Sequence, residues 1–255
     1  MKERLIDLPT RHGKMDTFIT HPEENGPFAA VVLYMDVWGL REELFDVARR
    51  IATVGYYCLV PNFYYRQGRI RHQFKDADGR MISLHALDEA RKQQVLAPLN
   101  KLTDQMVIDD TVDLLSFIDR GEPVKKGAIG SIGYCMGGRH VFRAAEHFPD
   151  RFRAGASLHG TALVTEAADS PHLGMKKARG EMYCGYAEKD PWTPPATIKV
   201  VAEIFRGTEA RYREVIHPGA DHGYALPDRD IHDKQAANRD WEIIFTMFRR
   251  QLGTT

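Results

Sequence analysis

Three separate loops carry residues whose types and order fit nucleophilic acyl chemistry. Residues 133–138 read GYCMGG, a G-x-C-x-G pattern in which a cysteine takes the nucleophile position of an elbow between a strand and a helix. The flanking glycines allow a tight turn with Cys135 at its tip. The N-terminus of the following helix favours a thiolate over a thiol. The backbone N–H of Met136 is then placed to stabilise an oxyanion.

A thiolate nucleophile needs a base and an acid that orients this base, and elbow enzymes supply them in the order acid, then histidine. Asp190 follows one expected strand and His222 follows the last one. Because the carboxyl ends of parallel strands share one edge of a sheet, we expect both side chains beside Cys135. Glu188 is the competing orienting residue, and we favour Asp190 because it stands at the far end of its loop.

Two simpler interpretations of these residues stay open. Free cysteine is commonly a small buried residue, and Cys135 could be one. The other interpretation is a metal cluster of His217, Asp221 and His222. We disfavour it because His217 is expected to end a strand whereas Asp221 opens a loop. We therefore expect no metal and no cofactor.

The three loops are positioned by strands that alternate with helices. Segments 4–8 and 15–20, with a turn at 11–13, predict a hairpin. Continuous apolar runs then predict strands that are buried on both faces, and helical periodicity separates them. We expect these strands at 28–34, 56–60, 127–133, 154–158, 182–186 and 212–216, and helices at 40–51, 104–119, 136–147, 194–205 and 234–251. The alternation predicts an α/β fold with one mostly parallel central sheet and helices on both faces.

The chain contains neither an internal repeat nor a flexible linker, so we expect a single domain over residues 1–255. One stretch, residues 66–103, has few strand signals and many charges. It separates a strand from the helix that should follow directly. We expect it to be a lid-like or substrate-binding insertion.

Composition excludes several classes of protein. Lys and Arg number 35, Asp and Glu also number 35, and this balance argues against a nucleic-acid partner. The longest apolar run, 28–35, is too short to span a bilayer, and the N-terminus lacks a signal-peptide pattern. The odd number of cysteines suits a reducing compartment. We expect a cytoplasmic protein without membrane partners, as a monomer or weak homodimer, in which Cys58 and Cys184 are inert core residues.

The motif at 133–138 and its spacing to Asp190 and His222 resemble the dienelactone hydrolase family of α/β hydrolases. A second block agrees, with MDVWG at 35–39, and the resemblance extends from about residue 28 to the final helix. It implies an α/β-hydrolase fold and an enzyme that cleaves a carboxylic ester or an (enol-)lactone. It is weakest over 66–103.

The resemblance also implies individual roles. Val37 stands where the family supplies a second oxyanion N–H, and Asp36 stands where the family has a glutamate that helps to control the protonation of the thiol. The type enzyme holds the carboxylate of its substrate with arginines, one of them four residues after the histidine, where this chain has Leu226. The other arginine would fall within 66–103, among Arg66, Arg69, Arg71 and Arg80.

Five further residues follow expected strands or catalytic residues, so we predict that they line a pocket for a small-molecule substrate: Trp38, Tyr64, His159, Trp192 and Tyr224. The predicted reaction proceeds through a thioester acyl-enzyme on Cys135. The alternative is a non-catalytic small-molecule-binding protein on the same fold, because a fold alone does not fix a function.

Overall fold

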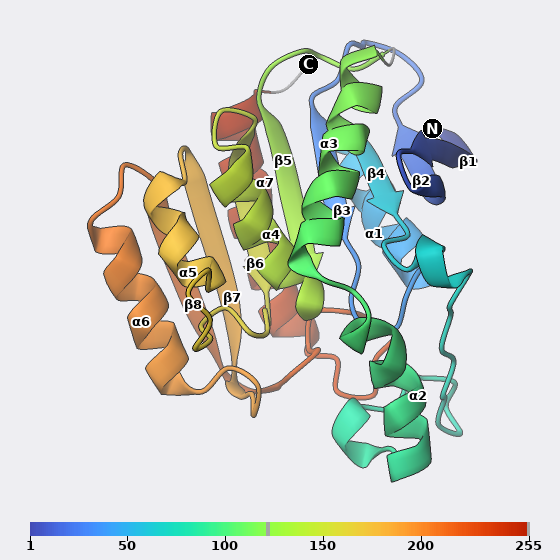
Figure 1. Cartoon of the computed structure of the whole chain (residues 1–255), viewed down its shortest axis with the longest axis vertical. Coiled ribbons are helices and arrows are strands. Elements are labelled where there is room, and N and C mark those ends of the chain that lie inside the picture. The colour runs from blue at the N-terminus through green and yellow to red at the C-terminus, as the bar shows by residue number, and fades with distance from the viewer. Residues whose placement is uncertain (121–122, 254–255) are drawn as a thin grey trace.

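The computed structural model describes residues 1–120 and 123–253 and contains one central sheet (Figure 1). Its strand order is β1-β2-β4-β3-β5-β6-β7-β8. Strands β1 and β2 form the predicted hairpin, and all neighbours from β4 to β8 are parallel, which confirms the predicted sheet. The strands are β1 (Lys2–Thr10), β2 (Gly13–His21), β3 (Ala30–Tyr34), β4 (Tyr57–Pro61), β5 (Ile129–Tyr134), β6 (Phe152–Leu158), β7 (Glu181–Lys189) and β8 (Arg211–Asp221).

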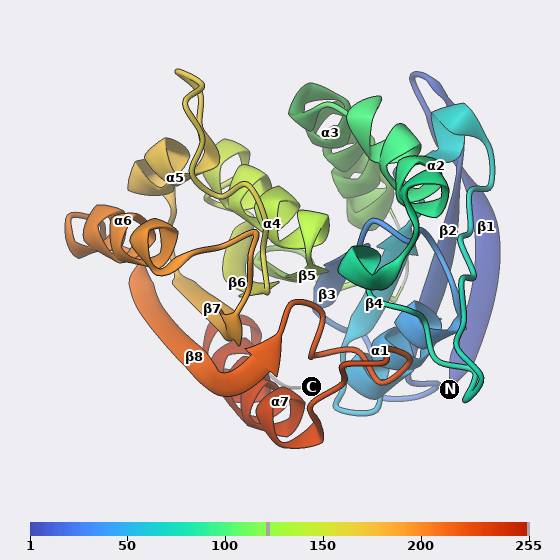
Figure 2. The same cartoon turned by 90° about the horizontal axis from the view of Figure 1, so that it is seen from below.

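Helices cover both faces of this sheet, as Figure 2 shows. One face carries α1 (Glu42–Ala52) and α7 (Lys234–Leu252). The opposite face carries α3 (Asp104–Arg120), α4 (Met136–His147), the short α5 (Pro171–Gly174) and α6 (Pro195–Arg206). Each long helix buries an apolar stripe, so sheet strands that are apolar on both sides lie between two helical layers. None of the helices in the described ranges is long and apolar enough to cross a bilayer.

The segment 66–103 contains a helix that the sequence analysis did not predict, α2 (Glu89–Asn100). Only Val95 and Pro98 of this helix are buried, so its sequence lacks the broad apolar stripe that marks the other helices. Val95 packs in a small separate cluster with Val37 and Trp38, away from the main core. Helix α2 is thus a cover over the end of β3 and not a layer of the sheet (Figure 1).

Among the contacts that fix the covering segment, residues 66–103, to the rest of the protein are those of Arg66 and Ser83. At its start, Arg66 forms two hydrogen bonds of 2.6 and 2.8 Å with the fully buried Asp110 of α3, which also accepts from Tyr65 Oη. Further along, the Ser83 N–H donates to Asp230 Oδ2 at 2.8 Å. These contacts hold residues 66–83 and place the following turn and helix at the sheet edge.

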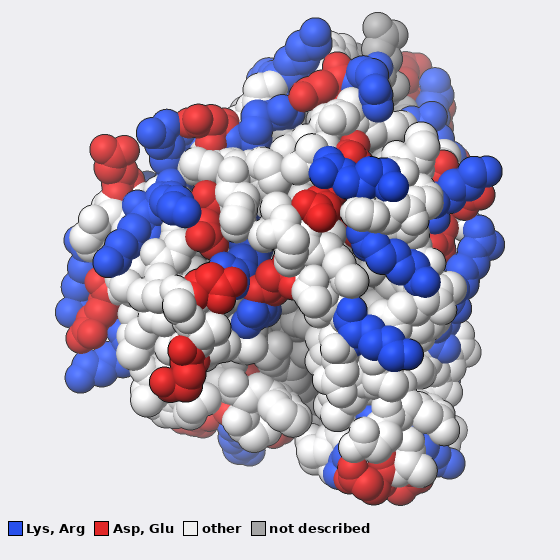
Figure 3. Space-filling view, viewed as in Figure 1, with Lys and Arg blue, Asp and Glu red and all other residues white. Residues whose placement is uncertain are grey.

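The surface fits the balanced composition. Lys and Arg side chains are intermixed with Asp and Glu side chains over the face shown in Figure 3. The absence of a nucleic-acid partner stays a prediction from the balanced composition.

Replacing Asp110 by alanine is expected to destabilise the protein by about 2 kcal/mol, because the half-buried Arg66 guanidinium and the Tyr65 hydroxyl lose the carboxylate that accepts their hydrogen bonds. Urea unfolding of wild type and variant measures this difference. Asp119→Ala is the matched control on the same helix, since Asp119 pairs with Arg151 at an exposed site, and its cost should stay below about 1 kcal/mol. Equal losses in the two variants would contradict the anchoring contact.

Candidate active site

The predicted nucleophile lies at a strained turn between β5 and α4. Cys135 has φ 56° and ψ −118°, a conformation that few residues other than glycine adopt. Two motif glycines permit it. A side chain on Gly133 would place its Cβ 2.1 Å from the Gly137 oxygen, and one on Gly137 would place its Cβ 2.2 Å from the Tyr34 oxygen. The turn can therefore be this tight only because both positions lack a side chain.

The loops after β7 and β8 bring an acid and a histidine to the same edge. His222 Nδ1 lies 2.7 Å from Asp190 Oδ2, and the Asp190 side chain is 1% exposed. The N–H of Trp192 donates to the other carboxylate oxygen at 2.9 Å and fixes it. Glu188 is exposed and accepts the N–H of Gly219 instead. Asp190, and not its rival Glu188, is therefore placed to orient the imidazole.

The charge on His222 is set by its two neighbours. Burial disfavours the imidazolium, but the interactions with Cys135 and Asp190 outweigh burial and raise the pKa of His222 to about 10. The arrangement thus favours an imidazolium between a carboxylate and the sulfur, which is the charge distribution that a cysteine nucleophile requires. His217, which the metal interpretation grouped with Asp221 and His222, turns away from His222. Its Nε2 lies 2.7 Å from Asp240 Oδ1.

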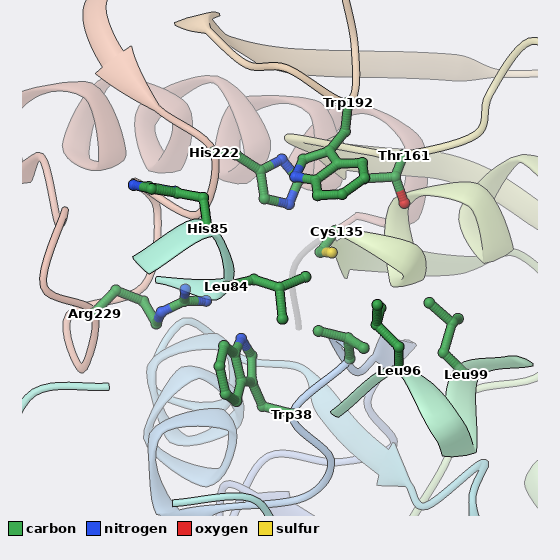
Figure 4. Close-up of a pocket in the computed structure, with 11 residues that line it drawn as sticks. Trp38, Leu84, His85, Leu96, Leu99, Cys135, Thr161, Trp192, His222 and Arg229 are labelled. Carbon is green, nitrogen blue, oxygen red and sulfur yellow. The ribbon is translucent and has the colours of Figure 1, made fainter. Parts of the chain in front are cut away.

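Cys135 and His222 face the same pocket, whose lining is mostly apolar, as expected of a site for a small organic ligand. Figure 4 shows Cys135 at its centre, with His222 and Trp192 on one side and Trp38 opposite. Arg229 and His85 lie toward one end, and two leucines of α2 lie toward the other. The lining residues are Val37, Trp38, Leu84, His85, Leu96, Leu99, Cys135, Thr161, Trp192, His222 and Arg229.

Trp38 and Trp192 line the pocket as the sequence analysis predicted, and their contact with a substrate stays a prediction. The prediction was wrong for Tyr64, His159 and Tyr224, which are at most 1% exposed and lie behind the pocket wall. Each has a buried polar partner that turns it inward. Tyr64 Oη contacts the Val37 oxygen, Tyr224 Oη donates to an aspartate, and His159 accepts from the backbone of the nucleophile.

Two backbone N–H groups at the pocket lack an acceptor in the described part of the chain, and their role as oxyanion donors stays a prediction. The N–H of Met136 is the first of α4 and has no acceptor within the helix. The N–H groups of Trp38 and Gly39 donate to Asp36, whereas that of Val37 has no acceptor among the described residues. Tyr64 Oη lies 3.3 Å from the Val37 oxygen and 3.4 Å from the Met136 sulfur, so it holds both segments together.

Asp36 has a different environment from the one expected of a residue that adjusts the thiol. Its carboxylate is 1% exposed and accepts two hydrogen bonds from Arg41, at 2.7 and 2.9 Å, and Arg41 also pairs with Asp228. Its charge is therefore committed to a neighbouring cation. No direct contact between Asp36 and Cys135 is found in the described part of the chain, so an influence on the thiol stays a prediction.

Arg229 is the functional candidate that the sequence analysis missed. It is 4% exposed, and its guanidinium lies 4.9 Å from the ring centre of Trp38. Within residues 1–120 and 123–253, its Nε has no hydrogen-bond partner and no carboxylate lies within ion-pair distance. Burial lowers the pKa of Arg229. The protein thus holds an unpaired cation at the wall of the pocket, which is costly unless a ligand supplies the anion.

None of the positions at which the sequence analysis looked for a substrate-binding arginine supplies such a cation. Leu226 is fully buried in the core, and Arg66 is held by Asp110. Arg69, Arg71 and Arg80 are exposed and do not line the pocket. Arg229 follows His222 by seven residues in the same loop, so a charged residue in the loop after this histidine was the available signal.

The covering segment supplies four pocket residues that no motif indicated, which are Leu84, His85, Leu96 and Leu99. The segment 66–103 therefore lines the pocket, and its binding of a substrate and a closing movement both stay predictions. Thr161 completes the wall from the loop after β6.

The topology and the elbow place this chain in the α/β-hydrolase fold. A solved structure from Klebsiella pneumoniae, described as a "putative dienelactone hydrolase", superposes with a TM-score of 0.83 over 98% of both chains, at 21% identity. At that identity the likeness speaks for the fold alone. A sequence profile of the dienelactone hydrolase family matches residues 15–252, and the chain therefore belongs to this family.

Relatives agree over nearly the whole length. A protein of Saccharolobus solfataricus named "putative carboxymethylenebutenolidase" is 27% identical over 270 residues, covering 97% of this chain and 98% of the relative. One of the same name from Methylorubrum extorquens is 25% identical over 248 residues, covering 96% and 80%. The chain is thus an enzyme of the ester- or lactone-hydrolysing kind, as the sequence predicted.

Removing the sulfur should change the titration of the neighbouring imidazole. In Cys135→Ala we expect the pKa of His222 to fall, because Asp190 alone then opposes the effect of burial. The imidazole NMR signals of His222, followed against pH, measure this change. Cys184→Ala, at a buried cysteine within β7, is the control and should leave the midpoint in place. An unchanged midpoint in Cys135→Ala would mean that sulfur and imidazole do not interact.

Proposed function

We propose that this enzyme hydrolyses a carboxylic ester or lactone with Cys135 as nucleophile, His222 as general base and acid, and Asp190 as the residue that orients the imidazole. The observation that carries the proposal is the meeting of three separate loops at one pocket, with His222 bound to the buried Asp190 at 2.7 Å and Cys135 facing the same space. Membership of the dienelactone hydrolase family supports the reaction class.

The first half of the reaction forms a thioester. The Cys135 thiolate attacks the carbonyl carbon, and the N–H groups of Met136 and Val37 stabilise the resulting oxyanion by about 3 kcal/mol per donor. The tetrahedral intermediate collapses with cleavage of the carbon–oxygen bond, and the leaving oxygen takes the proton of the His222 imidazolium. In a lactone, this leaving oxygen stays attached to the acyl chain.

The second half releases the acid. Neutral His222 takes a proton from water, and the oxygen of that water attacks the thioester carbon. Collapse of the second intermediate expels the thiolate and leaves the carboxylic acid, so that thiolate and imidazolium are restored. Asp190 keeps the proton of Nδ1 in place through both halves.

The natural substrate is proposed to carry an anionic group, such as a second carboxylate, opposite the scissile bond. Arg229 supports this proposal because its buried guanidinium lacks an acidic partner in the described chain and lies in the same pocket as Cys135. A carboxylate can accept two parallel hydrogen bonds from a guanidinium. Leu96 and Leu99 would contact the apolar part of such a substrate at the other end.

A cytoplasmic location and a monomeric or weakly dimeric state, without a cofactor, are part of the same proposal. All three cysteines are free, which suits a reducing compartment.

Hydrolysis of 4-nitrophenyl acetate, dienelactone and simple lactones by wild type and Cys135→Ala tests the nucleophile. We expect turnover to fall by at least about a thousandfold, because the covalent route is lost. Mass spectrometry of the rapidly quenched wild type should show an acylated peptide that contains Cys135. Cys184→Ala should retain turnover. Near-normal turnover in Cys135→Ala would overturn the mechanism, and no turnover in wild type together with slow alkylation of Cys135 would favour a non-catalytic binding protein.

A pair of esters matched in length tests the role of Arg229. In Arg229→Met, kcat/KM for mono-4-nitrophenyl succinate should fall about 10- to 100-fold, since a charge-assisted contact is worth about 1.5–3 kcal/mol. The value for the neutral 4-nitrophenyl butyrate should change little. Arg80→Met, at an exposed position of the covering segment, is the control and should affect neither ester. Equal losses on both esters would contradict recognition of the anion.

A further inference from the structure

His159 is buried at the centre of the site but does not touch the pocket. It follows β6 directly, and its φ of 38° is one that residues with side chains seldom adopt. Its own N–H donates to the Gly185 oxygen at 2.7 Å, which ties the end of β6 to β7. The ring is 1% exposed and lies among Tyr134, His222 and Tyr224. A strained, buried histidine beside a reactive cysteine calls for a physical reason.

The segment 158–161 holds both backbone groups of the nucleophile. The Cys135 N–H is shared between the Leu158 oxygen at 3.1 Å and His159 Nδ1 at 3.2 Å. The Cys135 oxygen accepts from the N–H of Thr161 at 3.1 Å. The elbow strains Cys135 by its positive φ, and such a conformation persists only when the surroundings fix it. These three contacts hold the Cys135 backbone in this conformation from the side of β6.

Acceptance by Nδ1 defines the chemical state of His159. The ring nitrogen that accepts the Cys135 N–H must carry a lone pair, so the proton of the neutral ring resides on Nε2. Nε2 is buried and has no partner among the described residues. Burial, the cationic His222 and Arg229 all lower the pKa of His159 well below its usual value. A second proton would remove the acceptor and place a cation beside another cation.

The same ring also bounds the catalytic imidazole. The ring centres of His159 and His222 are 4.9 Å apart and their planes are inclined by 72°. Asp190 holds His222 through Nδ1, so contact with His159 restricts its rotation about that hydrogen bond. The His159 side chain therefore contacts the backbone N–H of Cys135 through Nδ1 and the His222 ring through its own ring.

We propose that His159 is a positioning residue for catalysis, an imidazole that accepts the Cys135 N–H through Nδ1 and packs edge to face against His222. This role rests on the proposed function, because Cys135 and His222 are the groups that it aligns. It does not contact the substrate, and it takes no part in proton transfer.

Two substitutions separate the acceptor from the ring. His159→Phe keeps a ring but has no acceptor. His159→Asn places Oδ1 where Nδ1 lies and tolerates the left-handed backbone, but it lacks the ring. We expect kcat for 4-nitrophenyl acetate to fall about 10-fold in His159→Phe, which corresponds to about 1.4 kcal/mol, with little change in KM. His159→Asn should recover part of this loss. His21→Phe, at a buried histidine of β2 that stacks on Tyr57, is the control and should retain kcat.

Two readouts do not depend on turnover. Imidazole ¹H–¹⁵N spectra of wild type should show His159 as the neutral Nε2–H form throughout the pH range in which a free imidazole titrates. Alkylation of Cys135 by iodoacetamide should be slower in His159→Phe than in wild type. Titration of His159 near its usual pKa, a proton on Nδ1, or wild-type kcat and alkylation in His159→Phe would each overturn the positioning role. Absence of esterase activity in wild type would overturn the proposed function alone, since both readouts would still report on His159.

Discussion

The tight turn at Cys135 is the constraint on which the rest of the site depends. A residue with φ 56° between β5 and α4 aims a sulfur atom out of the sheet edge and, in the same turn, exposes the first N–H of a helix. This conformation is unfavourable in isolation. Close packing against β3 at Gly137, and hydrogen bonds from the loop after β6, hold it. The placing of the proposed nucleophile and of the proposed oxyanion donor at the start of α4 thus depends on one strained residue.

Buried charge is distributed unevenly around this turn. Arg41 lies between Asp36 and Asp228, so its charge is balanced within the protein. Arg229, the residue after Asp228, has no acidic partner in the described ranges. His222 has its carboxylate in Asp190. The folded chain therefore pairs most of its buried charges directly, whereas Arg229 lies at the pocket without a carboxylate in contact and interacts with Asp36 and Asp228 only at longer range.

Much of this arrangement could be predicted from the sequence because it depends on order and periodicity. Apolar runs and helical spacing define the strands and helices, and Cys135, Asp190 and His222 follow from the rule that sites gather at the carboxyl ends of parallel strands. The direction of a side chain after a strand has no such rule. His159 and Tyr224 also follow strands, yet a left-handed backbone at one and a buried hydrogen bond at the other turn both inward.

The helix of the covering segment could not be predicted, because its sequence lacks a periodic pattern. Helix α2 buries only Val95 and Pro98, so periodicity gives no signal, and its residues reach the pocket through three-dimensional contacts alone. Arg229 was missed for a related reason, since its position depends on the path of a loop. That loop is set by the contacts of Asp228 with Arg41 and of Asp230 with Ser83, both of which join residues far apart in the sequence.

The contacts of Arg66 and Ser83 that hold the covering segment have a consequence for how the pocket can change. Between Ser83 and the start of α3, the chain contributes Leu84, Leu96 and Leu99 to the pocket but no part of the sheet. A change of length or shape confined to this stretch would therefore remodel the chamber while every strand of the sheet stays in place.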